Sequence, residues 1–134
     1  MSVPIIFTYL KEMAERDASD LYLTEGFPPA IRVDDRIINI STTNLDVKDL
    51  NEILGMVLTN RQRREYETDM ELNTSLDMGK YGRFRLNVFR QKQSPGLVIR
   101  RVKTQIPSFE ELQIPALLKD LAMTKRGLIL VTGA

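Results

Sequence analysis

The sequence predicts an α+β domain in which a mostly antiparallel sheet is flanked by helices. Apolar residues recur at helical spacing over residues 5–16 and 47–58, which indicates two amphipathic helices. Apolar and polar residues instead alternate one by one over residues 83–88, which is typical of a strand with one buried face. Short segments of turn-forming residues separate the apolar runs, and short connections of this kind join antiparallel neighbours.

Turn and capping residues mark the elements of the first half of the chain. Asp34-Asp35-Arg36 lies between two apolar runs and is a hairpin signal. Asp46 and Thr59 each stand just before a helical pattern, where an oxygen-bearing side chain can cap the first backbone N–H groups. The expected elements are a helix at 5–16, strands at 21–24, 30–33 and 37–40, and helices at 47–58 and 61–68.

Glycine and proline mark the turns of the second half. Residues 79–82 separate two strand patterns, and Ser-Pro-Gly at 94–96 is expected to form a turn. Ser108 and Glu111 fit a capping box, and Pro115 suits the first turn of a helix. The expected elements are strands at 70–78, 81–91 and 97–102 and a helix from 115 to about 123.

A continuous apolar run at residues 128–131 follows Gly127 and leads into Thr132-Gly133-Ala134. Such a run is typical of a strand buried on both faces of a parallel sheet, which the antiparallel pattern before it does not provide. The run is either a last strand of the same sheet or the first strand of a second domain. An apolar strand that runs into Thr-Gly is also how a phosphate-binding loop begins.

The composition excludes several kinds of chemistry. The 134 residues include no cysteine and no histidine, so disulfides, thiolate metal sites and Ser-His or Cys-His nucleophile pairs are excluded. The start has no basic segment typical of a signal peptide, and no apolar run reaches membrane-spanning length. We therefore expect a cytoplasmic protein whose chemistry depends on carboxylates, lysine, arginine, hydroxyls and backbone groups.

Charge is distributed unevenly along the chain. The formal net charge is only +1, but residues 1–77 carry eight basic and fifteen acidic side chains. Residues 78–109 carry eight basic side chains and no acidic one. An acid-free stretch of this length predicts an anionic partner.

Five segments, in order along nearly the whole chain, match those of a known family. They are ASDLYLT (18–24), GFPPAIRV (26–33), GRFRLNVF (82–89), IPSFEEL (106–112) and TKRGLILVTGA (124–134). With these segments the chain resembles the N-terminal domain of the type IV pilus retraction ATPases, the PilT/PilU group. VIRRV at 98–102 and the Gly-Ala pair at 133–134 look more like the PilU branch than the PilT branch.

The resemblance implies a domain plan and a function. It implies a PAS-like N-terminal domain at 1–105, a linker with helices at 106–127, and the start of a RecA-like P-loop ATPase domain at 128–134. The implied function is that of a regulatory and oligomerisation domain in a hexameric motor ATPase that powers pilus retraction and twitching motility. ATP and magnesium are implied for the full-length enzyme. For these 134 residues alone, which have no Walker lysine, we expect neither a bound cofactor nor ATP hydrolysis.

The resemblance also implies partners and a location. The implied partners are the protein's own RecA-like domain, neighbouring subunits of a homohexamer, the inner-membrane platform protein of the pilus base and a paralogous retraction ATPase. No nucleic-acid partner is expected. The implied location is peripheral, at the cytoplasmic side of the inner membrane.

Candidate nucleotide-binding residues follow from the same resemblance. In the family, arginines from strands of this domain reach the γ-phosphate of nucleotide on the adjoining ATPase domain, and the matching positions are Arg85, Arg100 and, less clearly, Arg83. Gly133 and Ala134 would open the phosphate-binding loop. Arginine suits this role because its planar fork binds phosphate oxygens bidentately and stays charged. The alternative is that these arginines line the solvated face of an ordinary strand.

Other charged residues and functions have simpler interpretations. Asp17, Ser19 and Asp20 are expected to be cap and turn groups, because they form an incomplete metal cage. Arg101 is expected on the opposite strand face from Arg100. Two alternative functions are a nucleic-acid-binding module using the basic strands at 81–103 and a PAS-like sensor domain; Phe84, in the apolar alternation, argues against the first.

Overall fold

A computed structural model describes residues 4–133 of the chain. The chain divides into two compact units, Met1–Thr104 and Gln105–Ala134. The first unit contains three α-helices, a short 3₁₀-helix and six strands in its described part. They are α1 (Ile5–Glu15), β1 (Asp20–Thr24), β2 (Ala30–Val33), β3 (Arg36–Asn39), α2 (Val47–Val57), α3 (Asn60–Asp69), β4 (Glu71–Asp77), η1 (Gly79–Tyr81), β5 (Arg83–Gln91) and β6 (Ser94–Val102).

The six strands form one antiparallel sheet in the order β3-β2-β1-β6-β5-β4. Hairpins join β1 to β2, β2 to β3, β4 to β5 and β5 to β6. The central pair of strands, β1 and β6, is not a hairpin, because the two strands lie far apart in the sequence. Their alignment places Asp20 opposite Arg100. The predicted α+β class with an antiparallel sheet is confirmed, while the likeness to PAS domains stays a prediction.

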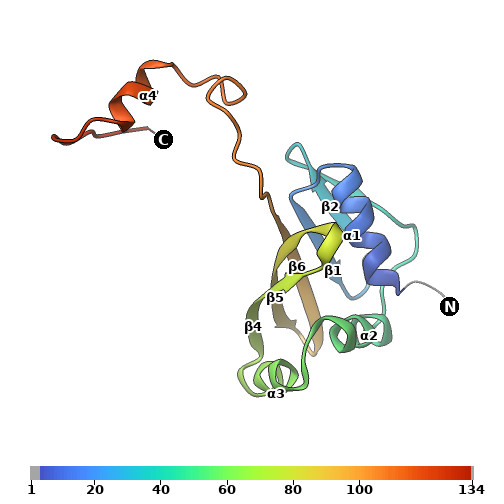
Figure 1. Cartoon of the computed structure of the whole chain (residues 1–134). Coiled ribbons are helices and arrows are strands. Elements are labelled where there is room, and N and C mark those ends of the chain that lie inside the picture. Colours follow the sequence, from blue (N-terminus) through green and yellow to red (C-terminus); the bar gives the residue numbers. More distant parts are fainter. Residues whose placement is uncertain (1–3, 134) are drawn as a thin grey trace. The chain divides into compact units, whose positions relative to one another are not determined.

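Helices α1, α2 and α3 pack on one face of the sheet and bury the apolar side of its strands (Figure 1). In β5, Phe84, Leu86 and Val88 are buried and alternate with exposed or half-buried residues, as the sequence predicts. Burial of large apolar side chains is the main stabilising contribution in a core of this kind. The fully buried set joins both layers: Ile6, Leu10, Met13, Leu21, Leu23, Ile31, Leu50, Ile53, Phe84, Val88, Leu97 and Ile99.

Both predicted helix caps are present. The Asp46 carboxylate accepts a hydrogen bond from the Asp49 backbone N–H at 2.8 Å, and the Asp49 carboxylate in turn accepts one from the Asp46 backbone N–H at 3.0 Å. Thr59 and Gln62 form the same reciprocal arrangement at the start of α3. Each cap satisfies backbone donors that the first helical turn leaves without partners.

The predicted turn at 94–96 is wrong, because Ser94, Pro95 and Gly96 all belong to β6. The hairpin turns two residues earlier: Gln91 pairs with Ser94, and Lys92 takes a positive φ of 58°. The partner strand β1 reaches only as far as Gly96, so Pro95 has a strand neighbour on one side only. A missing N–H is tolerated at such a position.

The second unit contains the helix α4 (Leu117–Ala122), shorter than the predicted helix at 115–123. Ser108 and Glu111 exchange the two hydrogen bonds of the predicted capping box, although turns and no regular α-helix follow directly. Residues 128–131 form no strand, and Leu128, Leu130 and Val131 are 82%, 77% and 88% exposed. A strand needs a hydrogen-bonded neighbour, and all six described strands pair within the first unit.

Candidate functional site

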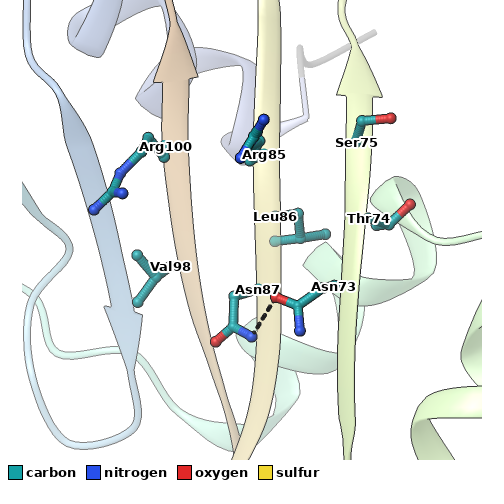
Figure 2. A pocket seen from close by; sticks show the side chains of 8 residues that line it. All are labelled: Asn73, Thr74, Ser75, Arg85, Leu86, Asn87, Val98 and Arg100. Carbon is teal, nitrogen blue, oxygen red and sulfur yellow. Dashed lines mark hydrogen bonds between the residues drawn. The ribbon is translucent and has the colours of Figure 1, made fainter. Parts of the chain in front are cut away.

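The candidate site is a groove on the sheet face opposite the helical layer. It has a volume of about 540 Å³ and lies over the neighbouring strands β4, β5 and β6 (Figure 2). Because side chains alternate across a strand, the burial of Phe84 and Leu86 on one face places Arg85 and Asn87 on the other. The lining residues are Asn73, Thr74, Ser75, Arg85, Leu86, Asn87, Val98 and Arg100.

Arg85 and Arg100 occupy directly opposite positions of the neighbouring strands β5 and β6. Both are exposed and both line the groove. The Arg85 side chain makes no ion pair or hydrogen bond with any residue of the described chain. Like charges directly opposite each other on a sheet are destabilising, so an anion bound between them would relieve this repulsion.

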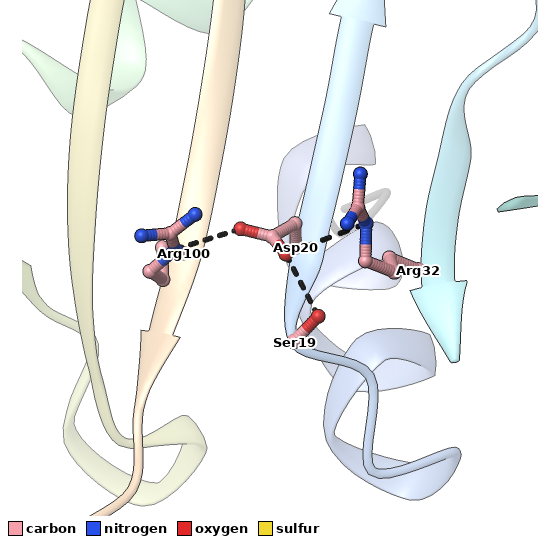
Figure 3. Close-up of polar contacts among 4 residues, drawn as sticks. All are labelled: Ser19, Asp20, Arg32 and Arg100. Carbon is pink, nitrogen blue, oxygen red and sulfur yellow. Dashed lines mark hydrogen bonds and ion pairs between the residues drawn. The ribbon is translucent and has the colours of Figure 1, made fainter. Parts of the chain in front are cut away.

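Arg100 differs from Arg85 because it has a carboxylate partner. Its Nε donates a hydrogen bond to Asp20 Oδ1 at 2.9 Å (Figure 3). Asp20 is only 4% exposed, and its other oxygen accepts a hydrogen bond from the Ser19 hydroxyl at 2.7 Å. Arg32 stands on the other side of the carboxylate, with its Nε 3.9 Å from Oδ2. One buried carboxylate therefore lies between two guanidinium groups.

The environment of Asp20 favours its charged form. Burial by itself raises the pKa of this carboxyl, but hydrogen bonds from Arg100 and Ser19 and the charges of Arg100 and Arg32 outweigh burial. The net result is a pKa below its ordinary value of 3.8. The hydrogen bond and charge of Asp20 in turn raise the pKa of Arg100. The pair is ionised on both sides at neutral pH.

Two amide side chains at one end of the groove are hydrogen-bonded to each other and to a carboxylate. Asn87 Nδ2 donates to Asn73 Oδ1 at 2.8 Å and to a Glu71 oxygen at 3.2 Å. The groove is thus lined by two cations, and guanidinium groups suit an anion that carries several oxygens. No cluster of carboxylates that could hold a metal ion is present in residues 4–133.

Arg83, the third candidate arginine, is not part of this pair. Arg83 lies on the same strand as Arg85 but outside the groove lining, 3.5 Å from Asp77 in an exposed ion pair. Gly133 belongs to the second unit, which is not placed relative to the first, and Ala134 lies outside the described residues. The structure therefore brings Arg85 and Arg100 together, whereas Arg83 has a partner of its own.

The sequence interpretation missed Asp20 and Arg32. Asp20 was expected in a turn, but it is the first residue of β1 and is buried beside Arg100. Asp17 does lie at a turn, with a positive φ of 49°, and it pairs with Arg101 at 2.8 Å and Lys103 at 3.0 Å. No local pattern predicts the Asp20–Arg100 pair, because it depends on the alignment of β1 with β6.

The nucleic-acid-binding alternative and the expected face of Arg101 can be compared with the same geometry. Phe84 is fully buried in the core, so its ring is not available to stack on a nucleotide base. Arg101 lies on the opposite face from Arg100, half-buried beside the Phe84 position, as expected. No helix in the described part of the chain is long and apolar enough to span a membrane.

Comparisons with known proteins identify relatives among pilus motors. The chain is 39% identical over 125 residues to the type IV pilus ATPase PilU of Pseudomonas aeruginosa, covering 93% of this chain and 33% of the relative. It is 34% identical over 120 residues to the retraction ATPase PilT of the same organism, covering 90% of this chain and 35% of the relative. No family model matches the sequence. The chain thus spans about a third of the length of these relatives.

Solved structures show the same fold. The crystal structure of the pilus retraction motor PilT with bound ADP matches with a TM-score of 0.77 and 36% identity, over 96% of this chain and 38% of that one. The ATPase DotB of Legionella pneumophila matches with a TM-score of 0.64 at 17% identity, over 94% of this chain and 36% of that one. The second likeness shows the fold alone.

Proposed function

We propose, from the premise that this chain belongs to the PilT/PilU-type pilus ATPases, that it is the regulatory and oligomerisation domain of a motor that powers type IV pilus retraction. In this proposal residues 1–105 form the N-terminal domain, 106–127 a linker, and 128–134 the start of the ATPase domain. In this proposal ATP and magnesium act in the ATPase domain, and the solved structure of PilT contains bound ADP. The domain described here supplies arginines to that nucleotide.

The observation that supports the proposal is the Arg85–Arg100 pair. The two arginines occupy directly opposite positions of β5 and β6, both line one open groove, and Arg85 has no acidic partner in residues 4–133. A phosphate group carries enough negative charge and enough acceptor oxygens to bind both at once. The alternative, a solvated strand face, does not explain why two arginines stand directly opposite each other.

The proposed arrangement acts on catalysis through charge and position. An arginine supplied from a separate domain stabilises charge that develops during phosphoryl transfer, and known arginine fingers contribute about 10³–10⁵ in rate. The same contact links the nucleotide state to the position of this domain, because the contact forms on ATP and is lost after hydrolysis. Arg83, paired with Asp77 outside the groove, would contribute less.

The proposed setting is a ring of identical subunits. In it, this domain contacts its own ATPase domain and a neighbouring subunit, and a homohexamer works beside a paralogous retraction ATPase on the platform protein of the pilus base. This places the protein at the cytoplasmic side of the inner membrane. These partners are part of the proposal and rest on the relatives' role as pilus ATPases.

The proposal is tested in a full-length ATPase that contains this chain, with the variants Arg85→Gln and Arg100→Gln. We expect each to lower kcat for ATP by roughly tenfold or more, since each removes a cation from the transition state. Arg61→Gln, an exposed charge on α3 away from the groove, is the matched control and should leave kcat unchanged. Wild-type turnover in both groove variants would support the solvated-face alternative and overturn the proposal.

A further inference from the structure

The two groove arginines are in different states before any ligand arrives. Arg100 leans toward β1 and donates its Nε–H to Asp20, whereas Arg85 has no acidic partner in the part of the chain that the structure describes (Figures 2 and 3). Asp20 takes only this one nitrogen of the guanidinium, so the two terminal nitrogens make no hydrogen bond within residues 4–133. Arg100 is therefore already paired with the Asp20 carboxylate, on the side away from Arg85.

The far side of Asp20 contains a donor that has no acceptor. Arg32 Nε is buried and makes no hydrogen bond, although it lies only 3.9 Å from Asp20 Oδ2. Buried donors are nearly always paired, and an unpaired one is costly. The Arg32 guanidinium also lies 5.8 Å from the centre of the Tyr22 ring, on the same strand as Asp20, which holds it near the carboxylate. Asp20 thus has a second guanidinium close enough to replace Arg100 after a small shift.

We propose that Asp20 is a positioning residue. It binds Arg100 while the groove is empty, and Arg100 leaves it for phosphate when phosphate binds. In the free protein Asp20 neutralises Arg100 and draws it toward β1. When a phosphate binds beside Arg85, Arg100 exchanges the carboxylate for phosphate oxygens, and the Arg32 Nε takes over the hydrogen bond to Asp20. This inference rests on the proposed function, since it concerns the arginines of the same groove.

The exchange has a defined consequence for phosphate affinity. Asp20 competes with phosphate for Arg100, and its negative charge also opposes an anion nearby. Asp20→Asn keeps the shape of the side chain but removes both effects. We expect it to tighten binding of inorganic tripolyphosphate to the whole chain by roughly three- to tenfold, from Coulomb energies at a high effective dielectric.

The experiment follows the arginine Nε–H signals by NMR during a tripolyphosphate titration at constant ionic strength. In the wild-type chain we expect the Arg100 signal to lose its carboxylate-bonded shift as phosphate saturates, with the same midpoint as the Arg85 signal. Asp17→Asn is the matched control, because it removes a carboxylate between Arg101 and Lys103 and changes the net charge equally. Its affinity should stay at the wild-type value. The wild-type titration tests the exchange even if a variant fails to fold.

The outcomes separate this inference from the proposed function. An Asp20→Asn chain that binds tripolyphosphate no better than the wild type, or an Arg100 signal that keeps its shift at saturation, overturns the exchange while the phosphate site stands. If Arg85→Gln and Arg100→Gln chains bind tripolyphosphate as well as the wild type, or if the wild type does not bind it at millimolar concentration, the phosphate site itself is wrong and the exchange with it.

Discussion

Asp20 is a buried carboxylate whose charge is balanced by two arginines and which accepts a hydrogen bond from a serine hydroxyl. Leaving either partner of such a pair alone costs free energy, because a buried charge without compensation is poorly solvated. The carboxylate pKa lies below its ordinary value of 3.8, so near that pH the folded chain binds fewer protons at Asp20 than the unfolded chain does. Asp20 therefore stabilises the fold above pH 3.8, and this contribution is lost as the pH falls through the lower folded pKa.

We predict that Asp20→Asn lowers the free energy of unfolding by about 1–3 kcal/mol at neutral pH, because it removes a buried charge-assisted hydrogen bond. The difference from the wild type should shrink as the pH falls from 3.8 through the lower folded pKa of Asp20, because the folded wild-type carboxyl also becomes neutral there. Urea denaturation at several pH values measures it. Asp17→Asn, at a carboxylate 69% exposed, is the control and should cost less. A difference that is constant with pH would contradict an ionic role for Asp20.

At the scale of elements, two glycines show how the same substitution has opposite effects in a helix and in a strand. Gly55 lies inside α2, and a Cβ there would only reach the Arg63 side chain at 3.5 Å. Gly96 lies in β6 opposite Phe89, and a Cβ there would come within 2.6 Å of the Phe89 ring. The first position has room for a methyl group, and the second is filled by an aromatic side chain.

We predict that Gly55→Ala raises the free energy of unfolding by roughly 0.5–1 kcal/mol, since alanine loses less backbone entropy in a helix. Gly96→Ala should lower it by about 1–3 kcal/mol, the usual cost of overpacking. Thermal or urea unfolding of the two single variants measures both. A Phe89→Leu background should reduce the cost at Gly96. Equal effects of the two substitutions would show that the ring does not restrict Gly96.

At the scale of the whole molecule, the core belongs entirely to the first unit. Its buried apolar cluster runs from Ile6 to Ile99 and includes residues of every strand except β3 and of all three α-helices of that unit. In residues 105–133 the large apolar side chains are mostly exposed, among them Ile106 and Met123 at 94% and 79%. Stability should therefore be a property of the first unit.

We predict that a chain of residues 1–104 unfolds cooperatively with a free energy of unfolding within about 0.5 kcal/mol of the whole chain, as for changes outside the core. Removing residues 105–134 takes away no member of the buried cluster. Urea unfolding of the two chains, followed by circular dichroism, makes the comparison. A large loss of stability or a broad transition in the shorter chain would show that the second unit supports the fold.

Much of the fold and part of the site could be predicted from the sequence. The amphipathic helices, the caps at Asp46 and Thr59 and the cationic face of β5 depend on residues only a few positions apart, and all are present. The family resemblance pointed to Arg85 and Arg100, and the structure places both in one groove. The turn at 94–96 and the strand at 128–131 were wrong, because both depend on which strands are available as neighbours.

The sequence by itself determined which faces of the helices and strands are apolar and where a cationic strand face lies. Only the tertiary structure decided which charges meet. Arg100 and Asp20 are 80 residues apart, and they become partners because β6, which forms a hairpin with β5, also pairs along its other edge with β1 at the centre of the sheet. Local sequence patterns indicate which residues are buried and where the chain turns. They do not predict the register between distant strands, since that register is set by packing of the whole core.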